Sequence, residues 1–139
     1  MSTISYSFSD ARVSLRSILD TSERGGISTI RRREHHDPAA IVNARLLRDF
    51  FESTVENNVQ LASEDGVWLM YMPGQSFAAE ANTLDEVIVD FIDGLRDYAE
   101  TWAEHFSTAS NHSKNWALVQ LVTLSDDEQL TRWLTGTAE

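Results

Sequence analysis

Residues 31–37, with the sequence RRREHHD, are the densest run of charged and titratable side chains in this chain of 139 residues. Guanidinium groups carry a permanent charge and several fixed hydrogen-bond donors, so an arginine cluster suits phosphate groups. Four residues separate Arg12 from Arg16, so one helix would present both on a single face. If that helix packs beside the run, the two groups form one cationic surface. The candidate phosphate-binding residues are Arg12, Arg16, Arg31, Arg32 and Arg33. The alternative is a solvated turn whose arginines pair with Glu34 and Asp37.

A second charged surface is acidic and lies in the segment 84–104, whose apolar residues recur at helical spacing. Its carboxylates fall on the face opposite the apolar stripe and include Asp85, Asp90, Asp93, Asp97, Glu100 and Glu104. A hydrolytic magnesium site needs carboxylates that converge from several elements on one pocket, whereas carboxylates on one amphipathic helix face solvent. We therefore expect no catalytic residues here and no enzyme.

The histidines do not predict a metal site. His35 and His36 are adjacent on a turn, and neither His105 nor His112 has a third ligand at a suitable spacing. The chain has no cysteine, which excludes disulfides, thiol catalysis and cysteine-ligated zinc. The sequence therefore predicts neither a metal nor a cofactor.

The formal net charge of −11 conceals two oppositely charged regions. Residues 1–48 hold eight arginines and five acidic residues, a net charge of +3. Residues 49–139 hold three basic and seventeen acidic residues, a net charge of −14. Such a division favours two partners of opposite charge over a solubilising surface whose charges happen to be unevenly placed.

Hydropathy argues against a membrane protein. No apolar stretch approaches the ~20 residues that a spanning helix needs, and the first twenty residues lack the apolar core of a signal peptide. The 42% hydrophobic content is enough for a packed core. We therefore expect a folded cytoplasmic protein.

The first half predicts the order strand, helix, strand, strand, helix. A strand at 3–7 precedes a helix capped by Ser7 or Ser9, which ends at Gly25-Gly26. The segments ISTIRRR and PAAIVN predict an antiparallel hairpin, and Asn43 can cap the next helix.

The second half repeats a strand and helix pattern. Strands are predicted at 67–72 and 77–81, joined by a Pro73-Gly74 turn, and Thr83 and Glu86 begin the helix over 84–102 as a capping box. Residues 115–124 fit a helix or a strand. A last helix, capped by Ser125 and Glu128, is predicted to reach Leu134. The fold class is α+β: a small antiparallel sheet with helices, then a β-β-α unit and C-terminal helices.

Residues 3–55 resemble the prevent-host-death (Phd/YefM) antitoxin family. Its N-terminal signature contains an S-E-A-R-x-x-L helix, an I-T-R strand and an A-V-L-V-S return strand. Ser9-Asp10-Ala11-Arg12 with Leu15, Thr29-Ile30-Arg31 and the segment 39–43 match these pieces in order. Two departures are a longer turn without glycine, RREHHD, and Arg45 where the family commonly has acids. Residues 64–104 resemble HicB-type antitoxin domains more weakly.

The resemblance implies an antitoxin of a type II toxin–antitoxin system. Residues 1–58 would form a homodimeric module that binds operator DNA, with Arg12 and Arg31 at the family's DNA-contacting positions and Arg16, Arg32 and Arg33 added by proximity. The acidic part 59–139 would neutralise a cognate basic toxin, a RelE-like ribonuclease, through Asp90, Asp93 and Asp97. The alternative is a protein-interaction or scaffolding module that does not bind DNA.

Overall fold

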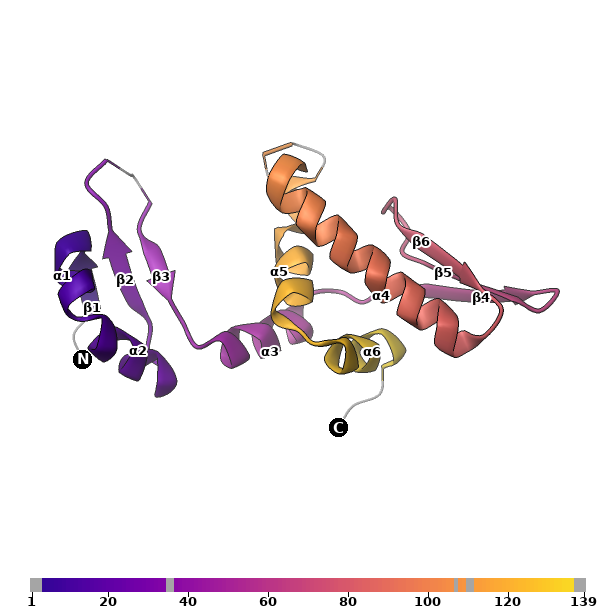
Figure 1. The fold of residues 1–139 in the computed structure, drawn as a ribbon, viewed down its shortest axis with the longest axis horizontal. Helices are drawn as coiled ribbons and strands as arrows, with labels where there is room; N and C mark the ends of the chain where they lie inside the picture. Colours follow the sequence, from indigo (N-terminus) through magenta and orange to yellow (C-terminus); the bar gives the residue numbers. More distant parts are fainter. Residues whose placement is uncertain (1–3, 35–36, 107, 110–111, 137–139) are drawn as a thin grey trace. The chain divides into compact units, whose positions relative to one another are not determined.

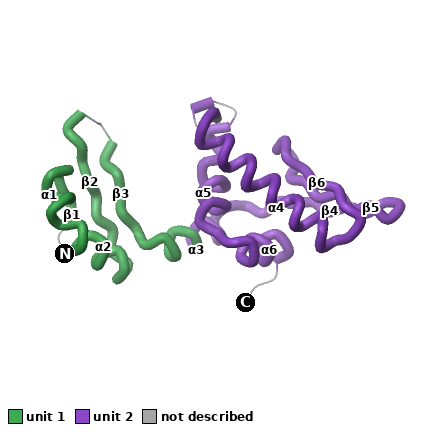
Figure 2. Tube along the Cα trace, viewed as in Figure 1, with its two compact units in different colours: residues 1–49 green, residues 50–139 purple. Residues whose placement is uncertain are grey.

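The computed structural model describes residues 4–34, 37–106, 108–109 and 112–136, which form two compact units, 1–49 and 50–139 (Figure 2). The first unit holds the order β1 (Ile4–Ser7), α1 (Phe8–Val13), α2 (Leu15–Glu23), β2 (Ser28–Arg31) and β3 (Ala39–Ile41). Helix α3 (Ala44–Thr54) follows and runs across the boundary between the units. The predicted element order of the first half is confirmed, except that two helices stand where one was predicted.

The sheet of the first unit is mixed. Strand β2 lies between β1, with which it pairs in parallel, and β3, with which it pairs antiparallel (Figure 1). The predicted hairpin is therefore confirmed, but the prediction of a wholly antiparallel sheet is wrong. The reason is the helical connection between β1 and β2, which returns the chain in the same direction, as parallel neighbours require.

The predicted first helix is two helices. Ser7 caps α1 as expected, because its hydroxyl accepts a hydrogen bond from the Asp10 N–H at 3.1 Å. Ser14 then leaves the helical region, with ψ near 16°, and α2 begins at Leu15. Gly25, at φ 92°, follows the end of α2 as the sequence predicted.

The core of the first unit is small. Ala11 of α1, Ile18 of α2 and Ser28 of β2 are buried where these helices pack on the sheet. The Ser28 hydroxyl has no hydrogen-bond partner among the described residues. By contrast, Phe8 and Leu15, on the predicted apolar stripe, are each 51% exposed.

The second unit begins with a three-stranded antiparallel sheet in the order β4 (Gln60–Glu64), β5 (Val67–Tyr71), β6 (Ala78–Ala81). The sequence predicted β5 and β6 but not β4. Asp65 and Gly66 join β4 to β5 with φ of 53° and 78°, the two positive angles of a type I′ hairpin turn.

Helix α4 (Leu84–Thr101) packs on β5 and β6, and α5 (Trp116–Leu124) and α6 (Asp127–Thr135) pack on α4 (Figure 1). The segment 115–124 is thus helical: Asn115 ends a short 3-10 helix, and α5 follows it. Thr83 caps α4 as predicted, with its hydroxyl accepting from the Glu86 N–H. The cap of α6 is Asp126 with Gln129, not the predicted Ser125 with Glu128: the Asp126 carboxylate accepts from the Gln129 N–H at 2.7 Å, and the Gln129 side chain accepts from the Asp126 N–H at 2.9 Å.

Two polar clusters join the helices of the second unit. The Arg96 guanidinium donates to the carbonyls of Val122 and Ser125 at 3.1 and 3.0 Å and to the Asp127 carboxylate at 2.6 Å.

Between α4 and α5 run a π-helical turn, η1 (Trp102–Phe106), and a short 3-10 helix, η2 (Ser113–Asn115). Asn115, which is buried, donates from its amide to Tyr98 and exchanges hydrogen bonds with Gln75.

Candidate nucleic-acid interface

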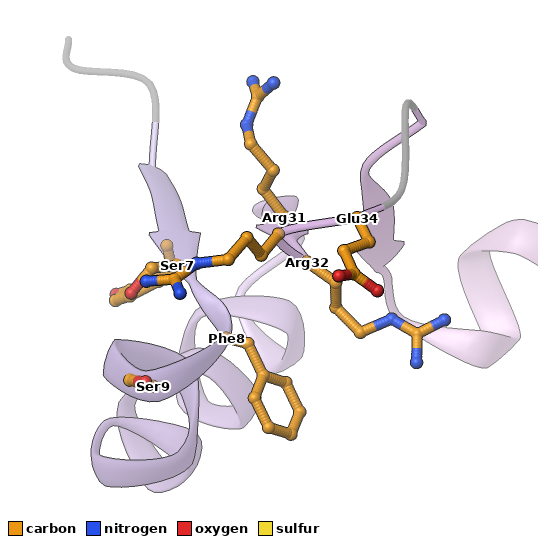
Figure 3. A pocket seen from close by; sticks show the side chains of 8 residues that line it. Ser7, Phe8, Ser9, Arg31, Arg32 and Glu34 are labelled. Atoms are coloured by element: carbon orange, nitrogen blue, oxygen red, sulfur yellow. The ribbon is translucent and has the colours of Figure 1, made fainter.

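The arginine run lines an open cavity of about 890 Å³ in the first unit. One wall is the end of β2 and the turn after it, and the other is the β1–α1 junction that the Ser7 cap holds in place. Figure 3 shows Arg31 and Arg32 projecting from the end of β2 in different directions, with Ser7, Phe8 and Ser9 on the opposing segment. The lining residues are Tyr6, Ser7, Phe8, Ser9, Arg31, Arg32, Arg33 and Glu34.

The three guanidinium groups of this cavity are available to a ligand. Arg31, Arg32 and Arg33 are all exposed. Within the described part of the chain, neither Glu34 nor Asp37 forms an ion pair with them. The structure therefore does not show the alternative, a turn whose arginines pair with Glu34 and Asp37. The cavity combines permanent positive charge with hydroxyl groups, which are the groups that contact phosphates.

The structure places Arg12 and Arg16 differently from the arginine run. Arg12 lines an adjoining apolar hollow of about 340 Å³, together with Arg32. Arg16 lines neither this hollow nor the cavity. The break at Ser14 separates the two side chains onto α1 and α2, so the expected single helical face for Arg12 and Arg16 is wrong.

The apolar hollow is a feature that the sequence did not locate. Its lining residues are Phe8, Ala11, Arg12, Leu15, Ile30, Arg32, Asp37 and Ala39. The sequence did predict the apolar stripe to which Phe8, Ala11 and Leu15 belong. It could not show that part of this stripe remains exposed to solvent.

The acidic surface of the second unit lies on α4, as predicted. Asp90, Asp93 and Asp97 are exposed on the side of α4 opposite its buried residues. Among the described residues, no ion pair holds any of the three. These three carboxylates therefore give this side of α4 a negative charge that is open to solvent.

The histidines form no metal site within the described residues. His35 and His36 lie outside the described residues. His112 instead takes part in a hydrogen bond of 2.8 Å between its Nδ1 and the Tyr98 hydroxyl. No helix in the described part of the chain has the length and apolar character needed to cross a bilayer.

The fold and these surfaces define a small α+β binding protein with a cationic and an acidic surface on separate units. Residues 1–135 match a PHD-like family model, described as the antitoxin of RelE/RelB toxin–antitoxin systems. The chain therefore belongs to this antitoxin family, and it is the antitoxin of a type II system rather than an enzyme. Both the predicted family and the prediction of no enzyme are confirmed.

A solved structure has the same fold. It comes from Syntrophomonas wolfei subsp. wolfei and is described as the antitoxin part of a candidate toxin/antitoxin system. The two chains share 20% sequence identity and a TM-score of 0.78, and the match covers 96% of each. The α+β fold class is thereby confirmed. No curated protein matches the chain.

Proposed function

We propose that this antitoxin binds operator DNA as a homodimer through residues 1–58 and neutralises a RelE-like ribonuclease through the acidic residues 59–139. The observation that carries the DNA-binding part is the cavity where three exposed arginines stand together without ion pairs to the described acids. Phosphate contacts of this kind supply the electrostatic, sequence-independent share of DNA affinity.

The apolar hollow supports dimerisation. A unit this small buries little surface alone, and such modules gain core by pairing. Phe8 and Leu15 are half exposed beside Ala11, Ile30 and Ala39, so a second copy would bury apolar side chains that water now covers. A two-fold dimer would present two arginine cavities to a roughly palindromic site.

Arg31 to Arg33 are the main DNA contacts in this proposal, with Arg12 beside them and Arg16 further away. The R31A/R32A/R33A variant of the full chain is expected to weaken operator binding and to reduce the salt dependence of the affinity. Each lost phosphate contact lowers the slope of log K against log salt by about one. Arg24→Ala is the matched control, because Arg24 is exposed in the same unit but lines neither the cavity nor the hollow.

Titration of fluorescent promoter DNA at several salt concentrations measures both quantities. If the triple variant remains folded and keeps its affinity and its salt slope, the arginines do not face DNA. The alternative function, a protein-interaction module, would then be favoured.

The acidic face of α4 is the surface proposed for the toxin. A ribonuclease needs a positive surface for RNA, and carboxylates that occupy it would exclude the substrate. Reversing Asp90, Asp93 and Asp97 to lysine is expected to slow association with the toxin while DNA binding is retained. Stopped-flow or surface-plasmon measurements with the adjacent gene's product test this, and an unchanged association rate would contradict it.

A further inference from the structure

Strand β4 is an edge strand: among the residues that the structure describes, it pairs with β5 alone. All five of its residues, Gln60–Glu64, are exposed. Leu61 is directly opposite Met70 in β5, so the two side chains share one face of the sheet. Met70 is buried under α4, but Leu61 remains 46% exposed. The cover that α4 provides therefore ends at β5.

The free edge of β4 carries few of the features that normally block pairing, since its single charged residue, Glu64, stands at the end of the strand. Five successive residue pairs join β4 to β5 without a bulge, and the sequence QLASE contains neither proline nor lysine. Exposed edges without such features are templates for an added strand. In an antiparallel pair alternate amides bond to the neighbour, so the remaining amides of β4 lie at its free edge.

This edge is held in its strand conformation at both ends. Before β4, the Asn57 side-chain amide donates to the backbone carbonyl of Trp133 in α6, and the Asn57 side-chain oxygen Oδ1 accepts from the Val59 N–H. After β4, the tight Asp65-Gly66 turn fixes its register with β5. A partner strand would therefore meet an edge that is already ordered, which reduces the entropy lost on binding.

The negative charge around β4 indicates which kind of strand could pair with its free edge. Glu64 and Asp65 stand at its end, and residues 49–139 carry a net charge of −14. A second copy of this acidic unit would be repelled, whereas an extended segment with positive charge would be attracted. We propose that β4 accepts an added strand from the cognate toxin, so that toxin and antitoxin share one continuous sheet. This inference rests on the proposed function, in which residues 59–139 hold the toxin.

Amide hydrogen exchange on the full chain, free and mixed with an inactive form of the adjacent gene's product, tests the inference. Strand addition is expected to slow exchange of the free-edge amides of β4 by about tenfold or more. If the complex forms and these amides exchange as fast as in the free chain, the inference is wrong. Protection already present in the free chain would mean that a second copy occupies the edge, which also overturns it.

A matched pair of variants gives an independent measurement. Leu61→Lys places a positive charge on the uncovered edge strand, and Val67→Lys places the same charge on β5, where Val67 is 38% exposed. Leu61→Lys is expected to weaken toxin affinity by about tenfold or more, and Val67→Lys by much less. Equal losses in two folded variants would contradict strand addition. If Leu61→Lys fails to fold, Ala62→Lys on the opposite face of β4 replaces it with the same expectation.

The two proposals fail in different ways. In one outcome, reversing the α4 aspartates slows toxin binding, but the amides of β4 are not protected from exchange in the complex. The proposed function then stands, and the strand addition is wrong. If the full chain does not bind the toxin at all, both are wrong.

Discussion

Replacing Arg96 with alanine should destabilise the second unit far more than an exposed ion pair would suggest. The guanidinium donates to two backbone carbonyls near the end of α5, Val122 and Ser125, and to Asp127 in the first turn of α6. The side chain of Asp127 is 73% exposed, so its ion pair contributes about 1 kcal/mol at most. Each hydrogen bond from the charged group to a carbonyl adds about 1 kcal/mol at this partial exposure. We therefore expect Arg96→Ala to lower the free energy of unfolding by about 2–3 kcal/mol.

Two comparison variants separate the carbonyl contacts from the ion pair. Asp127→Asn removes only the charge of the pair and should cost about 1 kcal/mol or less. Arg132→Ala is the matched control, because Arg132 is equally exposed, at 35% against 36%, but its ion pair among the described residues is with Glu128 in the same helix, α6. Its expected cost is below about 0.5 kcal/mol.

Urea unfolding followed by tryptophan fluorescence measures these differences. All four tryptophans lie in residues 50–139, so the signal reports on the second unit alone. The linear dependence of unfolding free energy on urea then gives the cost of each variant. If Arg96→Ala and Asp127→Asn have equal costs, the ion pair and not the carbonyl contacts holds α5 and α6 to α4, and the reasoning is refuted.

Three further variants test the packing. Ser28→Ala should raise the unfolding free energy of the first unit by about 1 kcal/mol in calorimetry, because it removes a buried hydroxyl with no partner among the described residues, and a loss would show that a partner exists. Asn115→Ala should cost about 2–3 kcal/mol by urea unfolding, since it removes the two hydrogen bonds that a buried amide exchanges with Gln75 and the one that it donates to the Tyr98 hydroxyl; a cost below about 1 kcal/mol would contradict this. Thr83→Ala should cost about 1 kcal/mol and reduce helix content by circular dichroism, and an unchanged midpoint would show that the α4 cap contributes nothing.

Local signals in the sequence predicted most of the elements. Ser7, Asn43 and Thr83 each cap the helix that was expected from their position, because a cap depends on the next three residues alone. The stripe of α4 was equally clear, since it repeats over five turns of a helix that is buried on one side.

The elements that were missed depend on contacts distant in sequence. The segment QLASE has neither alternation nor β-branched residues, and it becomes a strand only because β5 is there to pair with it. No glycine or proline lies at Ser14 from which the break between the two helices could have been predicted. Both α1 and α2 pack on β2, and the periodicity of one segment does not contain such contacts.

The candidate site was predicted only in part, because some of its residues are adjacent in sequence and others are brought together by the fold. Arg31, Arg32 and Arg33 are adjacent in sequence, so their grouping needed no fold. Their cavity also needs the β1–α1 junction, which the parallel pairing of β1 with β2 brings next to them. The placement of Arg12 in a separate hollow follows from the same pairing and was not visible in the sequence.

The contacts of Arg96 also bear on how long the antitoxin survives in a cell. A protease cleaves an extended segment, so the second unit becomes a substrate only when its helices open. Arg96 joins α4, α5 and α6, and the population of the open form falls as the free energy of these contacts rises. Where opening is fast relative to cleavage, the rate at which a protease cuts this unit follows the equilibrium between its closed and open forms, so Arg96→Ala should be cleaved faster than the unchanged chain.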